Sequence, residues 1–319
     1  MFQFDLPFDQ LQDFTLPQTK EPDFDAFWRR ILDRSKAQPL DASAATIPYV
    51  TPEVRVEEVS FAAYDGGRIA GWSLSLRETK PRPTMIFWHG YGGHKGSIMD
   101  FLVWALQGIT VLTFDVRGQL GDSTDLAEYP GGHTGGWISW GILEPEQYYL
   151  TRAYADTARA LDYACTRADV DPSRIGTTGC SQGGGLSLAA CSLDARPALC
   201  FAEVPGFCHF RRTLEMTRAN PWPDLYLYLA AWPDRIDRAM RTLSYVELNN
   251  LADRITCPTL VSVGLVDELC LPSTIYAAYN RIPAKDKKIV PCPFRGHEAG
   301  LMRETMLAWA RTHLVRSGG

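Results

Sequence analysis

Arg174-Ile-Gly-Thr-Thr-Gly-Cys-Ser-Gln-Gly-Gly184 is the stretch that decides the fold of this chain. A strand-like run, Arg174–Thr178, leads into a Gly-x-Ser-x-Gly pattern centred on Ser181, and a helix of small residues follows from Gly184 to Leu193. In that setting the pattern indicates a nucleophile elbow, a tight strand-to-helix turn that lifts a serine hydroxyl clear of the backbone. Only very small residues fit two positions before and after the serine. The alternative is a glycine-rich turn that happens to hold a serine.

The sequence around this turn repeats a short apolar run, a loop and a helical pattern. The apolar runs are Thr84–Trp88, Thr110–Val116, Arg174–Thr178, Leu199–Val204, Thr259–Val263 and Lys288–Pro291. The helical patterns lie near Ile98–Leu106, Glu146–Arg167, Gly185–Leu193 and Ile275–Asn280, with a last helix from about Leu301 to Val315. Earlier, an alternating pattern from Val54 to Leu76, broken at Asp65-Gly-Gly67, predicts two antiparallel strands. This order predicts an α/β-hydrolase fold, with a mostly parallel, doubly wound sheet and N-terminal antiparallel strands.

We expect residues 1–319 to form a single domain with two additions. The first is an N-terminal extension over about residues 1–45, in which Asp23–Leu32 has the pattern of a helix. The second is a helical insertion over about residues 207–252, placed at the carboxyl edge of the sheet, where such folds bind ligands. Its aromatic residues are expected in the core rather than stacked on sugar rings, as are Tyr148 and Tyr149. They are Trp222, Tyr226, Tyr228, Trp232 and Tyr245.

Composition excludes several classes of protein. The 319 residues are 45% hydrophobic, and 32 basic residues against 37 acidic ones give a net charge of −5. No basic run predicts nucleic-acid binding, and no apolar run reaches membrane-spanning length. The N-terminus, Met1-Phe-Gln-Phe-Asp5, lacks the basic and apolar regions of a secretory signal. The eight cysteines form no Cys-x-x-Cys pair, so we expect reduced, mostly buried thiols in a cytoplasmic protein, and no metal site.

A serine nucleophile needs a base and a group that orients the base. In doubly wound hydrolases these follow in the order serine, acid, histidine. Asp267 follows the strand Thr259–Val263, and His297 follows the next strand, just before the final helix. We predict the triad Ser181, Asp267 and His297. Glu268 and Glu298 remain alternatives for the acid. Of the other histidines, His313 lies in the last helix, His209 lies in the expected insertion, and three precede the serine: His89, His94 and His133.

A second glycine-rich turn, His89-Gly-Tyr-Gly-Gly93, follows the strand Thr84–Trp88. In esterases the matching turn donates a backbone N–H to the oxyanion hole, and the residue after the nucleophile donates the other. The predicted donors are therefore the N–H groups of Tyr91 and Gln182. The alternative is an ordinary strand-to-helix loop. Cys180 occupies a position whose side chain points away from that of the serine, so we expect it to pack rather than react.

Three motifs together resemble the signatures of the acetyl xylan esterase and cephalosporin C deacetylase family, carbohydrate esterase family 7. They are Gly179-Cys-Ser-Gln-Gly-Gly184, Arg117-Gly-Gln119 and His297-Glu298. The likeness covers about residues 5–315 and includes Asp23–Trp28, Trp140–Leu143, Thr242–Tyr245, Asn250–Asp253 and Pro272–Thr274. The chain departs from the family at Leu120, where glycine is frequent, and at Leu271, where the family has a first proline.

The resemblance implies the same triad and the same oxyanion donors, with a supporting structural role for Arg117 and Gln119. It also implies deacetylation of short xylo-oligosaccharides and of cephalosporin C, and a hexamer with its active sites in an internal chamber. We therefore expect a cofactor-free serine esterase acting on small acetylated carbohydrates. The alternatives are a broad short-chain esterase or amidase with a non-sugar substrate, and a catalytically silent binding protein of the same fold.

Overall fold

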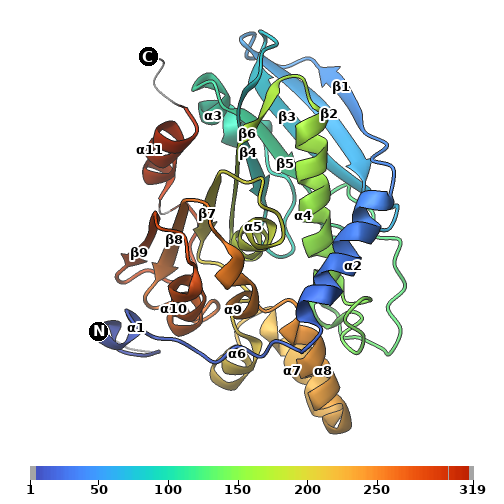
Figure 1. Cartoon of the computed structure of the whole chain (residues 1–319), viewed down its shortest axis with the longest axis vertical. Coiled ribbons are helices and arrows are strands. Elements are labelled where there is room, and N and C mark those ends of the chain that lie inside the picture. The colour runs from blue at the N-terminus through green and yellow to red at the C-terminus, as the bar shows by residue number, and fades with distance from the viewer. Residues whose placement is uncertain (1–4, 301, 316–319) are drawn as a thin grey trace.

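The computed structural model describes residues 5–300 and 302–315 of the chain, and in this part nine strands form one sheet (Figure 1). The strand order is β1-β2-β3-β5-β4-β6-β7-β8-β9. The antiparallel strands are β1 (Ser43–Ile47), β2 (Val54–Ala62) and β3 (Arg68–Leu76), and β3 also pairs antiparallel with β5. The strands joined in parallel are β4 (Arg82–Trp88), β5 (Thr110–Phe114), β6 (Val170–Cys180), β7 (Leu199–Glu203), β8 (Thr259–Gly264) and β9 (Lys287–Cys292). The predicted α/β-hydrolase fold is confirmed.

Helices cover both faces of the sheet, because the parallel strands are apolar on both sides. On one face pack α3 (Leu102–Leu106) and α11 (Arg303–His313), against side chains such as Met85. On the other face, where Ile86 points, pack α2 (Phe24–Ala37), α4 (Tyr149–Thr166), α5 (Gln182–Leu193) and α10 (Pro272–Arg281). The short elements α1 (Phe8–Leu11), η1 (Ile98–Phe101) and η2 (Trp137–Ser139) complete this part of the fold. The sheet is thus buried between two layers of helices.

Most predicted elements are found, with shifted ends. The Val54–Leu76 hairpin is confirmed, with Ala62 paired to Arg68 at its turn. The edge strand β1 is missing from the prediction because its side chains are largely exposed and show no alternation. The helix expected over Ile98–Leu106 is a 3₁₀ turn, capped by Ser97, that runs into α3. Leu301, the expected start of the last helix, and residues 1–4 of the N-terminus lie outside the described residues.

The segment between β7 and β8 is helical, as expected, and projects at the lower end of Figure 1. It contains α6 (Phe210–Met216), α7 (Trp222–Ala231), η3 (Pro233–Arg235), α8 (Ile236–Ser244), α9 (Leu248–Leu251) and η4 (Ala252–Arg254). Trp222, Tyr228 and Tyr245 are buried, but Tyr226 and Trp232 are 42% and 45% exposed. For those two the core prediction is wrong. Their rings instead support arginine guanidinium groups, each 3.9 Å from the ring centroid.

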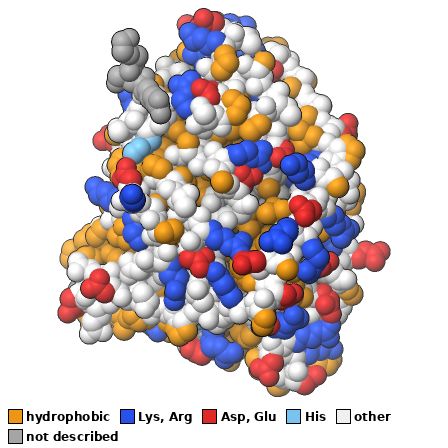
Figure 2. All heavy atoms as spheres, viewed as in Figure 1, with side chains coloured by type: hydrophobic (Ala, Val, Ile, Leu, Met, Phe, Trp, Pro, Cys, Tyr) orange, Lys and Arg blue, Asp and Glu red, His pale blue; other side chains and the backbone are white. Residues whose placement is uncertain are grey.

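The surface carries charges of both signs, and the thiols are unpaired. On the face seen in Figure 2, basic and acidic side chains are interspersed without a large area of one sign. All eight cysteines lie in the described part of the chain, and none is in a disulfide. Over that same part, no helix combines the length and the apolar character needed to cross a bilayer.

Candidate active site

Ser181 stands at the turn between β6 and α5 with φ 59° and ψ −120°. This left-handed conformation is strained for a residue with a side chain, and such strain gathers at functional sites. The flanking glycines are required by space. A Cβ atom on Gly179 would lie 2.4 Å from the Trp88 carbonyl oxygen, and one on Gly183 would lie 2.1 Å from the same atom. The predicted need for glycine on both sides of the serine is therefore confirmed.

A second strained loop, after β7, holds this turn in place. The Ser181 N–H donates to the Glu203 carbonyl at 2.9 Å, and the Gly206 N–H donates to the Ser181 carbonyl at 2.9 Å. Val204 and Phe207 in this loop have φ values of 37° and 64°. Valine rarely adopts such a conformation, because its branched Cβ crowds the backbone. Sequence reasoning missed this loop, since neither valine nor phenylalanine signals a left-handed turn.

His297 and Asp267 form a hydrogen-bonded pair. His297 Nδ1 lies 2.9 Å from Asp267 Oδ2, and the Asp267 side chain is fully buried. The other carboxylate oxygen, Oδ1, accepts bonds from the N–H groups of Leu269 at 2.8 Å and Cys270 at 2.9 Å. These bonds fix the carboxylate, and the carboxylate in turn fixes the ring. About a quarter of the His297 side chain remains exposed, so one edge of the ring is accessible.

The two alternative acids point elsewhere. Glu268 is exposed and contributes its carbonyl, not its carboxylate, to a bond with Thr217. The Glu298 carboxylate pairs with Arg295 at 2.8 Å on the surface. Asp267 is thus the carboxylate that the fold brings to His297.

The His297 side chain is hydrogen-bonded to Asp267 and not to the Ser181 hydroxyl, which lies near the thiol of Cys270. Hydrogen bonds between a nucleophile and its base are often long without substrate and shorten when it binds. Cys180, next to the serine, is half-buried, and burial raises the pKa of its thiol to about 12. A thiol with that pKa stays protonated at neutral pH and is a poor nucleophile.

The glycine-rich turn after β4 runs beside the elbow. A Cβ atom on Gly90 would lie 3.8 Å from the Ser181 Cβ. Within the described residues, the backbone N–H groups of Tyr91 and Gln182 donate no hydrogen bond to the protein. The N–H of Gln182 is unpaired because it opens helix α5. Both predicted donors are therefore available to an oxyanion.

Gln119 joins these two donor segments. Its Oε1 accepts from the Gly92 N–H at 2.8 Å, and its Nε2 donates to Gln182 Oε1 at 2.9 Å. Nε2 also contacts the hydroxyl of Tyr149, which donates to the Arg117 carbonyl at 2.6 Å. Gln119 is 8% exposed and Gln182 is 1% exposed. One amide side chain therefore links the turn after β4 to the start of α5.

His89 and Arg117 support the same region, His89 through hydrogen bonds and Arg117 through ion pairs. The Val116 N–H donates to His89 Nε2 at 2.8 Å, so the ring proton sits on Nδ1 and donates to Gly90. Arg117 is fully buried and binds three carboxylates. They are Asp156 at 2.7 Å, Asp65 at 2.8 Å and Asp125 at 3.3 Å. The position of Arg117 is that of a scaffold residue, one step removed from the serine.

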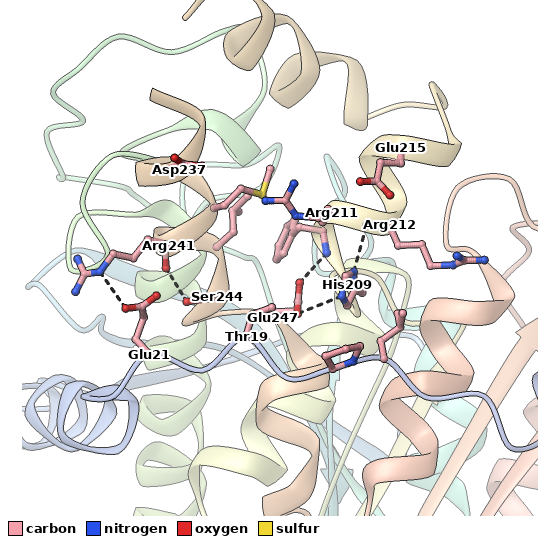
Figure 3. Close-up of a pocket in the computed structure, with 15 residues that line it drawn as sticks. Thr19, Glu21, His209, Arg211, Arg212, Glu215, Asp237, Arg241, Ser244 and Glu247 are labelled. Atoms are coloured by element: carbon pink, nitrogen blue, oxygen red, sulfur yellow. Dashed lines mark hydrogen bonds and ion pairs between the residues drawn. The ribbon is translucent and has the colours of Figure 1, made fainter. Parts of the chain in front are cut away.

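A separate cavity of about 520 Å³ lies among the N-terminal segment, α6 and α8 (Figure 3). Its walls hold a buried carboxylate, Glu247, which accepts from the Phe210 N–H at 2.9 Å and from Thr19 Oγ1 at 3.3 Å. His209 Nε2 faces the same carboxylate at 3.8 Å. Ser181, Asp267 and His297 do not line this cavity.

Comparison with known proteins gives a consistent result. Residues 1–313 match the family model described as acetyl xylan esterase (AXE1). The acetyl esterase Axe7A of Xylanibacter ruminicola is 28% identical over 286 residues, which cover 86% of this chain. The chain spans 63% of the length of that protein.

Two solved structures resemble the chain over nearly its whole length. The acetyl xylan esterase from Paenibacillus sp. R4 has a TM-score of 0.94 and 38% identity, covering 97% of this chain and 100% of that one. Acetyl xylan esterase 1 from Thermoanaerobacterium sp. JW/SL YS485 has a TM-score of 0.92 and 29% identity, covering 98% and 99% respectively.

Proposed function

Because this chain belongs to the acetyl xylan esterase family, we propose that it is a serine esterase that removes acetyl groups from short acetylated xylo-oligosaccharides and related small esters. The observation that carries the proposal is the buried Asp267–His297 pair, joined at 2.9 Å, beside a serine in a strained elbow. The names of the similar acetyl xylan esterases support acetyl as the acyl group that the enzyme removes.

In the proposed mechanism Ser181 Oγ attacks the acetyl carbonyl carbon while His297 Nε2 accepts the hydroxyl proton. Asp267 holds the proton on Nδ1 and stabilises the imidazolium that forms. The carbonyl oxygen gains a negative charge, which the N–H groups of Tyr91 and Gln182 stabilise. When the carbon–oxygen bond to the sugar breaks, His297 returns the proton to the departing sugar oxygen.

The second half of the reaction removes the acetyl group from the serine. A water molecule attacks the acetyl-enzyme carbonyl and gives a proton to His297. The bond to Ser181 then breaks, the serine recovers its proton from His297, and acetate leaves. Every step uses groups of this chain and water.

The direct test replaces the nucleophile. Ser181→Ala should lower p-nitrophenyl acetate hydrolysis by at least about 10³-fold, because the covalent route is lost. Ser173→Ala, an exposed serine on the same strand, is the matched control and should keep wild-type activity. Substantial hydrolysis by Ser181→Ala would contradict the mechanism.

Two experiments address the alternatives. Fluorophosphonate should label the wild-type protein and not Ser181→Ala, whereas a silent binding protein would label in neither form. Acetate release from acetylated xylobiose and cephalosporin C, beside p-nitrophenyl esters of increasing chain length, distinguishes a sugar deacetylase from a broad esterase or amidase. Preference for longer acyl chains would favour the broad enzyme.

We further propose that the protein is cytoplasmic and hexameric, and that residues 1–319 form one domain with an N-terminal extension over about 1–45 and a helical insertion over about 207–252. The family resemblance supports the hexamer. So do the apolar side chains exposed on α7 and just after it, Tyr226, Leu227 and Trp232. Light scattering at several concentrations measures the oligomeric state, and a monomer would refute the hexamer.

A further inference from the structure

A buried thiol lies inside the group of predicted catalytic side chains. Three possible metal-ligand atoms, one each from Asp267, Cys270 and His297, lie within 4.8 Å of one another. Cys270 is 4% exposed and Asp267 is fully buried, while part of His297 is open to solvent. The proposed hydrolysis does not use the thiol, although it lies near the Ser181 hydroxyl.

We propose that these three side chains form a binding site for Zn²⁺ and that zinc bound there reversibly blocks the esterase. The proposal rests on the proposed function of the triad, and zinc acts in it as an inhibitor, not as a resident cofactor. The donor set favours zinc, because a thiolate sulfur, an imidazole nitrogen and a carboxylate oxygen are its usual protein ligands. Magnesium and calcium prefer oxygen ligands alone.

The geometry needs little adjustment. In a tetrahedral site with zinc bonds of about 2.0–2.1 Å, the nitrogen and oxygen ligands stand roughly 3.3 Å apart. His297 Nδ1 and Asp267 Oδ2 are already 2.9 Å apart. With a zinc–sulfur bond of about 2.3 Å, the sulfur stands roughly 3.5 Å from the other two ligands. One ligand atom from each of the three side chains lies within 4.8 Å of the other two, so closing the site around zinc requires movements on the order of 1 Å.

The environment of the carboxylate also suits a cation. The second oxygen of Asp267 keeps its two backbone N–H donors, so the ligand stays oriented when the first oxygen binds metal. Zinc with one carboxylate and one thiolate is electrically neutral, which limits the cost of burying the ion. Ser181 Oγ or a water molecule is available for the fourth position.

Zinc binding removes what catalysis needs. The metal binds His297 Nδ1, the ring proton moves through solvent from Nδ1 to Nε2, and the Cys270 thiol releases its proton to solvent. His297 then no longer has its hydrogen bond to Asp267, and its free electron pair is committed to the metal. Such a ring does not serve as the general base for Ser181.

A second group of thiols provides the matched control. Cys191 lies within hydrogen-bonding reach of Cys200 and Cys257, away from the elbow. Cys257→Ser changes that group and leaves the triad intact. Cys270→Ser replaces the proposed sulfur ligand with a hydroxyl of similar size, which is a weak ligand for zinc.

The experiment measures zinc binding and zinc inhibition separately. Competition with a chromophoric chelator gives the stoichiometry and affinity for Zn²⁺, and p-nitrophenyl acetate hydrolysis gives the inhibition, with each variant compared to its own zinc-free rate. The wild type should bind one Zn²⁺ per chain at the triad and recover its activity with EDTA. Cys270→Ser should need at least about tenfold more zinc in both assays, since even changes outside the ligand shell weaken zinc binding 10- to 100-fold.

The outcomes are separable. Cys257→Ser should match the wild type, and Mg²⁺ at equal concentration should not inhibit. Equal zinc affinity and inhibition in Cys270→Ser and the wild type would overturn the proposal. If Cys270→Ser fails to fold, His297→Ala must show the same loss of affinity in the chelator assay. Because that assay needs no turnover, an inactive wild type that binds zinc would contradict the proposed function and leave the zinc site standing.

Discussion

The side chain of Gln119 makes two contacts that together set the spacing of the proposed oxyanion hole. Gln119→Leu leaves a side chain of similar size but removes the amide that bridges Gly92 and Gln182. We expect kcat to fall about 10- to 100-fold with a smaller change in KM, because loss of a whole oxyanion donor costs about 10²–10³. Steady-state hydrolysis of p-nitrophenyl acetate measures both constants.

The control for this variant is Gln107→Leu. Gln107 lies at the end of α3 and contacts Arg311 on the surface, far from the donor segments. It should leave both constants unchanged. A Gln119→Leu enzyme with wild-type kcat would show that the two turns keep their places without the amide.

Glu247 makes stability depend on pH. Burial raises its pKa from 4.5 to about 7, although hydrogen bonds from Phe210 and Thr19 oppose the shift. Between about pH 4.5 and 7 the folded protein holds a proton that the unfolded chain has lost, so stability falls as pH rises through this interval. At pH 8, Glu247→Gln should therefore raise the free energy of unfolding by on the order of 3 kcal/mol.

Thermal melts at pH 4 and pH 8 check this expectation. The wild type should lose more stability between the two values than Glu247→Gln does. Glu215→Gln, an exposed carboxylate at the same cavity, should melt like the wild type at both values. If the melting temperatures of Glu247→Gln and the wild type changed equally with pH, ionisation of the Glu247 carboxylate would not cost the folded state free energy, and the expectation would be wrong.

At the scale of residues, the pairing of Asp267 with His297 could be predicted because each follows a recognisable strand in a known order. The catalytic roles of these two residues and of Ser181 stay predictions. The contact between Gln119 and Gln182 joins residues 63 positions apart, and no local pattern encodes it. The left-handed φ of Val204 was equally hidden, since tertiary hydrogen bonds impose it against the preference of the residue.

At the scale of elements, the junction of β6 and α5 depends on how closely β4 approaches it. A methyl group on Gly183 would collide with the backbone of Trp88, which has no flexible end to move aside. Gly183→Ala should therefore displace the elbow and lower kcat for p-nitrophenyl acetate by more than about 100-fold, since small misplacements at a reacting centre have effects of that size.

Gly135→Ala is the matched control, because the nearest atom to its Cβ would be 3.9 Å away. It should keep wild-type activity. An active, stable Gly183→Ala enzyme would mean that β4 and α5 can separate without loss of function.

The buried elements were the easiest to predict and the exposed ones the hardest. The parallel strands are continuous apolar runs, so their patterns are strong. β1 has exposed side chains and is held by its pairing with β2, which the sequence does not display. Helix α10 begins at Pro272, ahead of the predicted Ile275, because proline suits the first helical turn. That signal is weaker than the apolar pattern that predicted the helix.

At the scale of the whole molecule, Arg117 joins the hairpin turn, the loop after β5 and helix α4 through Asp65, Asp125 and Asp156. Arg117→Met leaves buried carboxylates without their cation, which costs about 3–5 kcal/mol. We expect the melting temperature to fall by on the order of 10 °C. Differential scanning calorimetry at pH 7 measures the change.

Arg30→Met is the comparison, because Arg30 pairs with Glu146 on the surface. An exposed ion pair contributes little, so that variant should melt near the wild type. The Arg117 cluster also makes the stability of the protein depend on pH in the acidic range. Despite burial, Arg117 lowers the pKa of Asp65 to about 2, so its contribution is present above about pH 4 and is lost as pH falls toward 2. Similar melting of the two variants would show that the cluster is no stronger than a surface pair.

The position of helix α5 has a consequence for how the enzyme fails. Its residues from Gln182 to Ser192 are buried, and β6 lies in the interior of the sheet, whereas β9 and the His297 loop lie at an edge and are only half-buried. Local opening requires less free energy at such edges than in a core. The serine thus lies in a region that costs more free energy to open than the region that holds its base. Fluctuations that release the histidine leave the nucleophile in place. When the edge closes again, the site is restored without refolding of the core.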